Sequence, residues 1–144
     1  LSQVLSKAIQ KASDRIYLSG IKVIKDFEGS YFIMADEDKL EIAILNIIVN
    51  ASEATKPQEG VIELKIARHE SDFVLSISDN GHGLENAEID RLFEAFYTSK
   101  STGVGVGLNS VKSILDDHDA KIEVDSKPNK GTTFKLFFHN ADLQ

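Results

Sequence analysis

The apolar residues of this chain follow a helical spacing in some segments and a strand-like pattern in others. The first segment predicts a helix within residues 1–14, because its apolar side chains recur every three or four positions: Val4, Leu5, Ala8, Ile9 and Ala12. Two β-like runs follow, at Ile21–Phe27 and Tyr31–Met34. The intervening Glu28-Gly29-Ser30 is typical of a turn, so the two runs are predicted to pair as a hairpin.

A long helix is predicted next. Asp36 is a suitable N-cap, the helix is expected to end near Thr55, and the residues at 56–60 stop it. The predicted strands are mostly neighbours along the chain with helices interleaved, which favours an α+β two-layer sandwich in a single domain over residues 1–144. The remaining predicted elements are the strands Val61–Arg68, Phe73–Asp79, Lys121–Ser126 and Thr132–His139 and the helices Glu88–Phe93 and Gly107–Asp117.

The composition narrows the class of protein. With 42% hydrophobic and 27% charged residues, the chain has the composition of an ordinary soluble globular domain. A net charge of −7 argues against a nucleic-acid-binding surface, and the absence of cysteine excludes disulfides and thiolate metal sites. No run approaches the roughly 18 consecutive apolar residues of a membrane span. We expect a cytoplasmic fragment without membrane contact of its own, from a longer protein whose anchor, if it has one, lies elsewhere.

Asn46 and Asn50 lie one turn apart on the predicted long helix, on a face flanked by Ile42 and Val49. Asparagine is a poor helix former, so two of them at aligned, half-apolar positions need a reason. One interpretation is that both carboxamides point at a magnesium–phosphate cluster, where an amide oxygen is a suitable hard ligand. The other is that both are ordinary surface residues, and the pair alone favours this second interpretation.

The segment Asp79-Asn80-Gly81-His82-Gly83-Leu84 follows a predicted strand. A carboxylate at the strand end, beside glycines that let the backbone approach closely, is suited to accept a hydrogen bond from the exocyclic amine of a base. The alternative is an ordinary Asn-Gly turn, which the segment alone slightly favours. His82 is expected to be an exposed loop residue, because no second histidine or acid lies at metal-ligand spacing.

The glycine-rich segment Gly103-Val104-Gly105-Val106-Gly107-Leu108 precedes a predicted helix. Glycines before a helix N-terminus favour an anion, since free N–H groups and the helix dipole both attract phosphate. The segment lacks the Gly-Lys-Ser/Thr of a Walker loop, and no predicted strand precedes it as in a dinucleotide fingerprint. Lys100 adds the positive charge that phosphates favour, although a single lysine is more simply a solvated one.

Taken in order, these segments resemble the GHKL superfamily, whose Bergerat-type ATP-binding fold is shared by histidine kinases, gyrase-type topoisomerases, heat-shock chaperone ATPases and mismatch-repair ATPases. The resemblance covers nearly the whole chain, and the ordered combination is specific although no single segment is. It implies a mixed, mostly antiparallel sheet of about five strands, covered on one face by about three helices. The matching motifs are the N-box Leu45–Ala51, the first glycine box Asp79–Gly83, the phenylalanine box Leu92–Lys100, the second glycine box Gly103–Leu108 and the final Gly131–Phe134.

The resemblance implies a site for ATP and Mg²⁺, in which Asn50, Asn46 and Lys100 serve catalysis. Asn50 would coordinate the metal between the phosphates, with Asn46 in support. Asp79 would accept from the adenine amino group, and Thr132 would complete that network. The other implied contacts are Gly81 and Gly83 around the base, Phe93 and Phe96 as anchors of a lid at Ala95–Val106, Lys100 near the phosphates, and Gly103, Gly105, Gly107 and Leu108 around them.

Two features favour phosphoryl transfer over hydrolysis. In the hydrolysing branches a glutamate one turn before the metal-binding asparagine activates water, whereas Asn46 at this place cannot act as a general base. The Phe-x-x-Phe-x-Thr-x-Lys run that ends at Lys100 is typical of histidine kinases. Glu53 departs from the pattern, because many histidine kinases have a basic residue there, so neutralisation of the phosphates would depend more on Mg²⁺ and Lys100.

The sequence therefore predicts the catalytic domain of a two-component sensor histidine kinase, a protein-histidine kinase. It would transfer the γ-phosphoryl group of Mg-ATP to a histidine on a separate dimerisation and phosphoacceptor domain, with a response regulator downstream. Two alternatives stay open: an anti-sigma-type serine kinase, and an ATP-sensing module that transfers nothing. The acceptor is not expected among the chain's own histidines, which lie in loops or near the ends of elements: His69, His82, His118 and His139.

Overall fold

The computed structural model describes residues 1–27, 31–93 and 107–139. These residues form helices and strands in an interleaved order. The elements along the chain are α1 (Ser2–Lys11), α2 (Ser13–Leu18), β1 (Lys22–Asp26), α3 (Glu37–Ala54), β2 (Val61–His69), β3 (Asp72–Asp79), α4 (Asn86–Arg91), α5 (Gly107–Asp117), β4 (Lys121–Lys127) and β5 (Gly131–His139).

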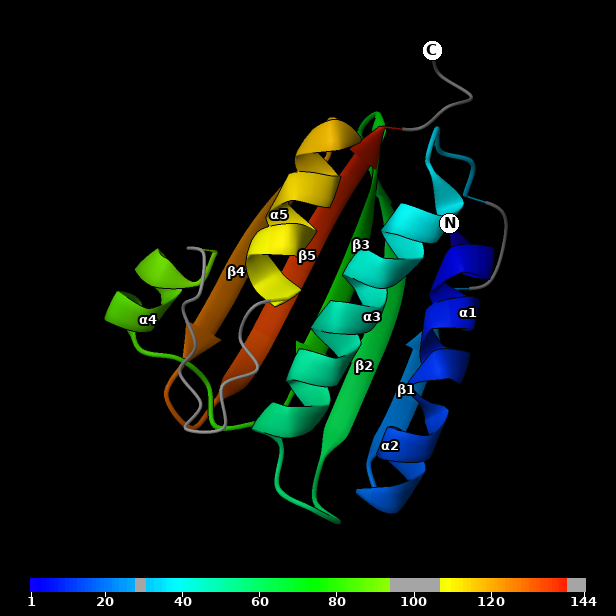
Figure 1. The fold of residues 1–144 in the computed structure, drawn as a ribbon. Helices are drawn as coiled ribbons and strands as arrows, with labels where there is room; N and C mark the ends of the chain where they lie inside the picture. Colours follow the sequence, from blue (N-terminus) through cyan, green and yellow to red (C-terminus); the bar gives the residue numbers. More distant parts are fainter. Residues whose placement is uncertain (28–30, 94–106, 140–144) are drawn as a thin grey trace.

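The strands form one mixed sheet of five, in the order β1-β2-β3-β5-β4. β1 pairs in parallel with β2, and the other neighbouring strands pair antiparallel. Helices α1, α3 and α5 lie on one face of the sheet with α3 in the middle, and α4 lies beside β4 at one edge (Figure 1). The predicted α+β two-layer fold, with its mostly antiparallel sheet covered on one face, is confirmed.

The hydrophobic core fills the space between the sheet and these helices. Four large apolar residues of α3, at helical spacing, are fully buried: Leu40, Ile44, Ile47 and Ile48. The inward rows of β3 and β5 are also buried: Phe73, Leu75 and Ile77, and Phe134, Leu136 and Phe138. Because strand side chains alternate between the two faces of a sheet, Asp79 and Thr132, which continue these rows, also face the helices.

The predicted hairpin between Ile21–Phe27 and Tyr31–Met34 is wrong. The first run contains β1, but the partner of this strand is β2, and the second run forms no strand. A parallel pair needs a crossover connection, and here the crossover contains α3. The turn predicted at residues 28–30 lies outside the described residues.

The run at 31–34 alternates in burial without belonging to a sheet. Phe32 and Met34 are 59% and 75% exposed, whereas the ring of Tyr31 packs edge-on against Phe73 with ring centroids 5.2 Å apart. A period of two in hydrophobicity therefore reports which side of the backbone faces the core, and it does not identify a hydrogen-bonded neighbour.

Helix boundaries follow capping residues more closely than hydrophobic spacing. Asp36 is the N-cap of α3 as predicted, and its Oδ1 accepts from the N–H of Lys39 at 3.2 Å. The short helix predicted at Glu88–Phe93 begins two residues earlier as α4, because Glu85 and Glu88 form a capping box around its first turn. The opening helix divides into α1 and α2 at Ala12. No helix among the described residues is long and apolar enough to cross a membrane.

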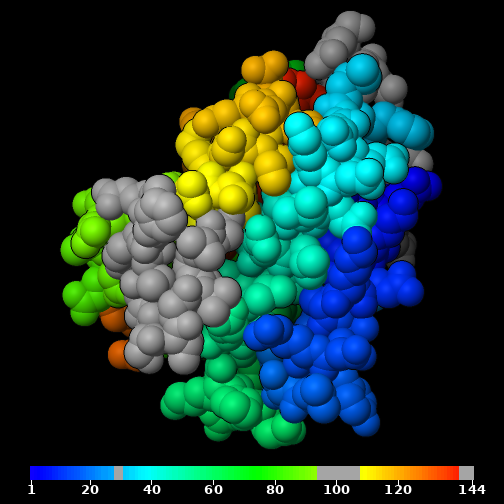
Figure 2. All heavy atoms as spheres, in the orientation of Figure 1, coloured from blue at the N-terminus to red at the C-terminus, as the bar shows by residue number. Residues whose placement is uncertain are grey.

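An ion pair joins α1 to α3, whose surfaces adjoin in the space-filling view, with α3 between α1 and α5 (Figure 2). Lys11 Nζ lies 2.6 Å from Oε1 of Glu41, whose side chain is only 10% exposed. Side-chain hydrogen bonding and charge attraction from Glu41 raise the pKa of Lys11 above its usual 10.5. Because the pKa is raised in the folded state, the pair stabilises the fold below pH 10.5, and this contribution is lost as the pH rises through the raised pKa.

Replacing Lys11 with methionine is expected to lower the free energy of unfolding at neutral pH, because the largely buried Glu41 carboxylate loses its cation. Urea unfolding followed by circular dichroism measures the change. The matched control is Lys7→Met: Lys7 Nζ lies 4.0 Å from Glu37 and both side chains are mostly exposed, so little change is expected. Equal losses in the two variants, or a Lys11→Met loss that does not shrink at strongly alkaline pH, would contradict this assignment.

Candidate functional site

The end of β3 places a carboxylate inside the molecule. Asp79 is the last residue of β3 and is only 8% exposed, because it continues the inward row of that strand. Its Oδ1 accepts a hydrogen bond from the N–H of Gly81 at 2.8 Å. Thr132, its register partner on β5, is 6% exposed. The two residues that the sequence assigned to base recognition are therefore direct neighbours, and both are suited to accept a hydrogen bond from a ligand.

The loop after Asp79 meets the last turn of α3. The N–H of His82 donates to the carbonyl of Ala54 at 3.0 Å, which satisfies one of the helix-terminal carbonyls that lack a partner within the helix. A Cβ on Gly81 would lie 2.7 Å from the carbonyl carbon of Ala54 and 2.8 Å from Oδ1 of Asp79. The backbone approaches this closely because Gly81 has no side chain.

On its other side the loop meets the turn between β4 and β5. The N–H of Asn129 donates to the carbonyl of His82 at 2.6 Å. Gly83 has φ +70°, and a Cβ there would overlap the carbonyl oxygen of Lys127. The loop is therefore held between the end of α3 and this turn. A cavity of about 500 Å³ opens where the three segments meet, lined among others by Glu53, Ala54, Asn80, Gly81, His82 and Asn129.

Asn80 attaches the loop to β2, although the sequence suggested only a turn residue. Its Oδ1 accepts from the N–H of Val61 at 2.8 Å, and its Nδ2 donates to the carbonyl of Glu59 at 3.0 Å. One side chain thus satisfies backbone groups on both sides of the entry to β2. The Asn-Gly pair signalled a turn, but nothing in the local sequence pointed to a partner 19 residues away.

Ser126 on β4 is a second residue that the sequence analysis missed. Its hydroxyl donates to the carbonyl of Gly131 at 3.0 Å, accepts from the N–H of Leu84 at 2.8 Å, and lies 2.8 Å from Oγ1 of Thr132. It therefore joins the chain after the Asp79 loop to the start of β5. Asp79, Ser126 and Thr132 line one cavity of about 360 Å³. The only sequence signal was a serine at an inward position of a strand.

Asn46 and Asn50 lie on α3 and are both half-buried. Asn50 precedes Ala54 by one turn, which at about 1.5 Å per residue places it roughly 6 Å along the helix axis from the contact with the loop. The described residues contain no group of three or more His, Asp or Glu side chains able to hold a metal ion. The amide oxygen of Asn50 is a suitable ligand for Mg²⁺, and such an ion would depend on phosphate oxygens and water for its other ligands.

The remaining predicted site residues are only partly within the described structure. Phe93 follows α4 and packs half-buried against the core. Gly107 is the first residue of α5. The side chain of Leu108 is 5% exposed within the core, so only its backbone is placed to meet a phosphate. The other four lie outside the described residues: Phe96, Lys100, Gly103 and Gly105.

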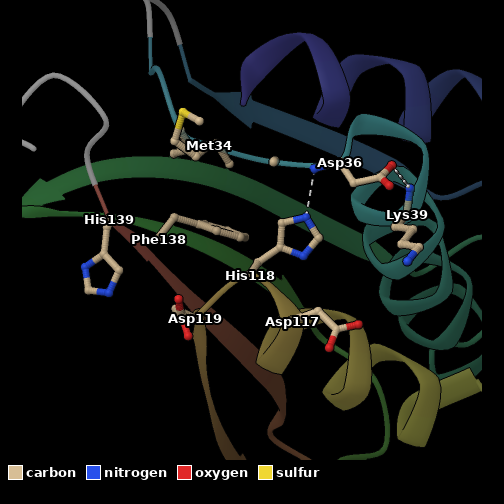
Figure 3. A pocket seen from close by; sticks show the side chains of 10 residues that line it. Met34, Asp36, Lys39, Asp117, His118, Asp119, Phe138 and His139 are labelled. Atoms are coloured by element: carbon tan, nitrogen blue, oxygen red, sulfur yellow. Dashed lines mark hydrogen bonds between the residues drawn. The ribbon is translucent and has the colours of Figure 1, made fainter.

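A separate cavity of about 520 Å³ lies at the start of α3 and the end of α5, away from the Asp79 loop (Figure 3). There His118 Nε2 accepts from the N–H of Asp36 at 2.9 Å, while Nδ1 lies 2.7 Å from the carbonyl of Ile114. These contacts require the neutral imidazole with its proton on Nδ1, and they tie the end of α5 to the N-cap of α3. None of the predicted site residues that the structure describes lines this cavity.

Comparison with protein families gives a match over residues 35–142 to the family described as histidine kinase-, DNA gyrase B-, and HSP90-like ATPase. The matched region covers well over half of the chain. It includes α3, the Asp79 loop, α5 and both strands that flank the β4–β5 turn.

Individual relatives agree with this family. The chain is 34% identical over 122 residues to Sporulation kinase A of Bacillus subtilis (strain 168), a match that covers 84% of this chain but only 20% of that protein. The catalytic domain of histidine kinase ThkA, in a nucleotide-free form, superposes with a TM-score of 0.87 at 22% identity over 97% of this chain and 92% of that one. Full-length ShkA in complex with AMPPNP gives a TM-score of 0.82 at 25% identity, over 96% of this chain and 30% of that one. The chain therefore belongs to the histidine kinase-, DNA gyrase B- and HSP90-like ATPase family.

Proposed function

We propose that this chain binds Mg-ATP between α3, the Asp79–Gly83 loop and the lid predicted at Ala95–Val106, and that it transfers the γ-phosphoryl group to a histidine on a separate phosphoacceptor domain. The observation on which the proposal rests is the buried Asp79 carboxylate beside Thr132, at the end of α3 that contains Asn50. The ATPase family match supports ATP as the ligand. So does the complex of ShkA with AMPPNP, an analogue of ATP.

Asp79 recognises the base in this proposal. Burial of a carboxylate is costly unless it accepts hydrogen bonds, and the N–H of Gly81 supplies one of them. The exocyclic amine of adenine supplies another hydrogen bond to this carboxylate in the proposal. Gly81 and Gly83 keep the loop close enough to α3 and to the β4–β5 turn for the base to reach Asp79.

Asn50 and Asn46 act at the phosphate end of the proposed site. Asn50 offers its amide oxygen to Mg²⁺, and Asn46, one turn earlier, supports that position. When bound, the metal neutralises phosphate charge and stabilises the charge that develops during transfer. Lys100, the glycines at 103, 105 and 107 and the backbone of Leu108 complete the enclosure of the phosphates, with Phe93 and Phe96 anchoring the lid.

Asn46 is also the reason to propose transfer in place of hydrolysis. An amide cannot take a proton from water, so this helix offers no general base one turn before Asn50. Positioning of the acceptor imidazole and neutralisation of charge then account for catalysis. Residues 1–144 are proposed to be one domain, since the buried residues of the described part of the chain form one core cluster. The acceptor histidine is proposed to belong to another domain of a longer cytoplasmic or membrane-anchored kinase. A response regulator is the proposed downstream partner.

Calorimetric titration of the folded chain with ATP and MgCl₂ tests the binding step, and the absence of any uptake would exclude the proposal. Incubation of the parent protein with radiolabelled ATP tests the transfer step. Acid-labile, base-stable label indicates phosphohistidine, as proposed, whereas acid-stable label indicates a serine kinase. Normal ATP binding without label indicates a nucleotide-sensing module.

Replacing Asp79 with asparagine is expected to weaken ATP binding by roughly ten- to hundredfold, because a charge-assisted hydrogen bond contributes about 1.5–3 kcal/mol. Calorimetry measures the change, and circular dichroism checks the fold. The matched control is Asp26→Asn, since Asp26 is also the last residue of a strand but is exposed. Unchanged affinity in Asp79→Asn would remove this residue from base recognition.

A further inference from the structure

We propose that Ser126 determines base selectivity by fixing Thr132 as a hydrogen-bond acceptor. The inference rests on the proposed ATP site and adds to it a residue on β4 that touches no nucleotide in that proposal. Ser126 is therefore a positioning residue, and its effect on the ligand passes through the hydroxyl of Thr132.

The direction of each hydrogen bond around Ser126 follows from counting protons. Three groups surround its Oγ: the N–H of Leu84, the carbonyl of Gly131 and the hydroxyl of Thr132. The N–H of Leu84 can only donate, and the carbonyl of Gly131 can only accept, so the single hydroxyl proton of Ser126 goes to Gly131. The contact of 2.8 Å between the two hydroxyls must then use the proton of Thr132.

Thr132 consequently presents only lone pairs to a ligand. Its proton points at Ser126, and turning it away would leave a contact with Ser126 unmade in a buried environment, since Thr132 is 6% exposed. Asp79, the register partner of Thr132, is an acceptor as well, and both residues line the same cavity as Ser126. This end of the site is thus a pair of adjacent acceptors.

Two adjacent acceptors distinguish between purine bases. The exocyclic amine of adenine has two N–H donors and can satisfy both. Guanine places a carbonyl oxygen at the corresponding position. This oxygen, Asp79 and Thr132 are all acceptors, so none of them receives a hydrogen bond from the others. The hydrogen bonds from Thr132 to Ser126 and from Ser126 to Gly131 therefore disfavour a base with a carbonyl at this position, although Ser126 itself contacts no base in the proposal.

Calorimetric titration with ATP and with GTP, each with Mg²⁺, tests this inference on the folded chain. Ser126→Ala frees the Thr132 hydroxyl to donate, so the preference for ATP over GTP is expected to fall by about tenfold, the equivalent of one neutral hydrogen bond. Ser126→Thr retains the hydroxyl and is expected to restore the original preference. The matched control is Ser78→Ala, because Ser78 and Thr133 form the same kind of hydroxyl pair, 2.9 Å apart, on the other face of the sheet.

A Thr132→Val background separates selectivity from a merely structural role. If Ser126 acts through Thr132, Ser126→Ala has no further effect on the ATP-to-GTP ratio once the Thr132 hydroxyl is absent. An equal effect in both backgrounds would show that Ser126 acts through Leu84 and the loop, and the inference would be wrong.

A fallback variant and two further outcomes complete the test of Ser126. Should Ser126→Ala not fold, Ser126→Cys replaces it: a thiol sulfur is a weak acceptor for the Thr132 proton, so the same loss of preference is expected. An unchanged ATP-to-GTP ratio in the folded variant overturns the role of Ser126 while leaving the proposed function intact. Absence of ATP uptake by the unmodified chain overturns the proposed function, and this inference with it.

Discussion

Replacing Asn50 with alanine is expected to reduce phosphoryl transfer by roughly a hundred- to a thousandfold while the fold survives, which is the usual loss when a preorganised group that stabilises transition-state charge is removed. Asn50 offers the only proposed protein ligand to Mg²⁺, so the remaining ligands would have to hold the metal without α3. Alanine is the better helix former, so the change favours the helical conformation at this half-buried position of α3.

The effect of Asn50→Ala differs in kind from that of Asp79→Asn. Asp79 contacts the base, which does not react, so its loss weakens binding and leaves the bound complex competent. Asn50 acts where charge develops, so its loss should appear in the rate of transfer at saturating ATP. The two residues lie on different elements, α3 and β3, and therefore provide independent tests of the two halves of the site.

Transfer from radiolabelled ATP to the acceptor histidine of the parent protein, measured at saturating nucleotide, gives the rate. Asn86→Ala is the matched control, because Asn86 is exposed at the start of α4 and is expected to leave the rate unchanged. Retention of transfer by Asn50→Ala, in a protein that still binds ATP, would remove Asn50 from the mechanism.

Features that depend only on neighbouring residues along the chain could be predicted from the sequence. The Asp36 cap and the strands predicted at Phe73–Asp79 and Thr132–His139 depend on residues within a few positions of each other, and the structure has the cap as predicted and both strands to within one residue. The neighbouring positions of Asp79 and Thr132 followed from the order of motifs in the family resemblance, because 53 residues separate them and no spacing rule relates the two.

Local sequence could not predict which strands pair with each other or which distant groups a side chain hydrogen-bonds. Ile21–Phe27 has the pattern of a strand, but its pairing with β2 depends on α3 crossing between them, and a closer run at Tyr31–Met34 offered a simpler neighbour. Ser126 meets Leu84 from 42 residues away, and a hydroxyl in an alternating strand is compatible with many partners. The period of the hydrophobic pattern shows which face of the sheet a residue lies on. The pairing register of the strands determines which residue lies opposite it.

The loop around Asp79 shows how tightly register constrains single residues. Gly83 has φ +70°, in the left-handed region, and a Cβ there would overlap the carbonyl oxygen of Lys127 and lie 2.8 Å from its carbonyl carbon. These atoms belong to the backbone at the end of β4, next to the β4–β5 turn, which is itself fixed by the hydrogen bond from Asn129 to His82. Relief of the overlap therefore requires the loop or the turn to move.

Replacing Gly83 with alanine is expected to lower the free energy of unfolding by about 3 kcal/mol or more, since the left-handed conformation costs about 1–2 kcal/mol and overpacking a further 1–3 kcal/mol. That is a large part of the stability of an ordinary domain, and ATP affinity should fall with it because Asp79 moves with the loop. Urea unfolding and calorimetry measure the two effects. Gly20→Ala is the matched control: Gly20 has φ +64°, but a Cβ there meets only the flexible end of the Gln58 side chain, so it isolates the conformational cost and leaves ATP affinity intact. Equal losses of stability in the two variants would mean that the loop yields to the turn, and that the close approach at Gly83 does not hold Asp79 in place.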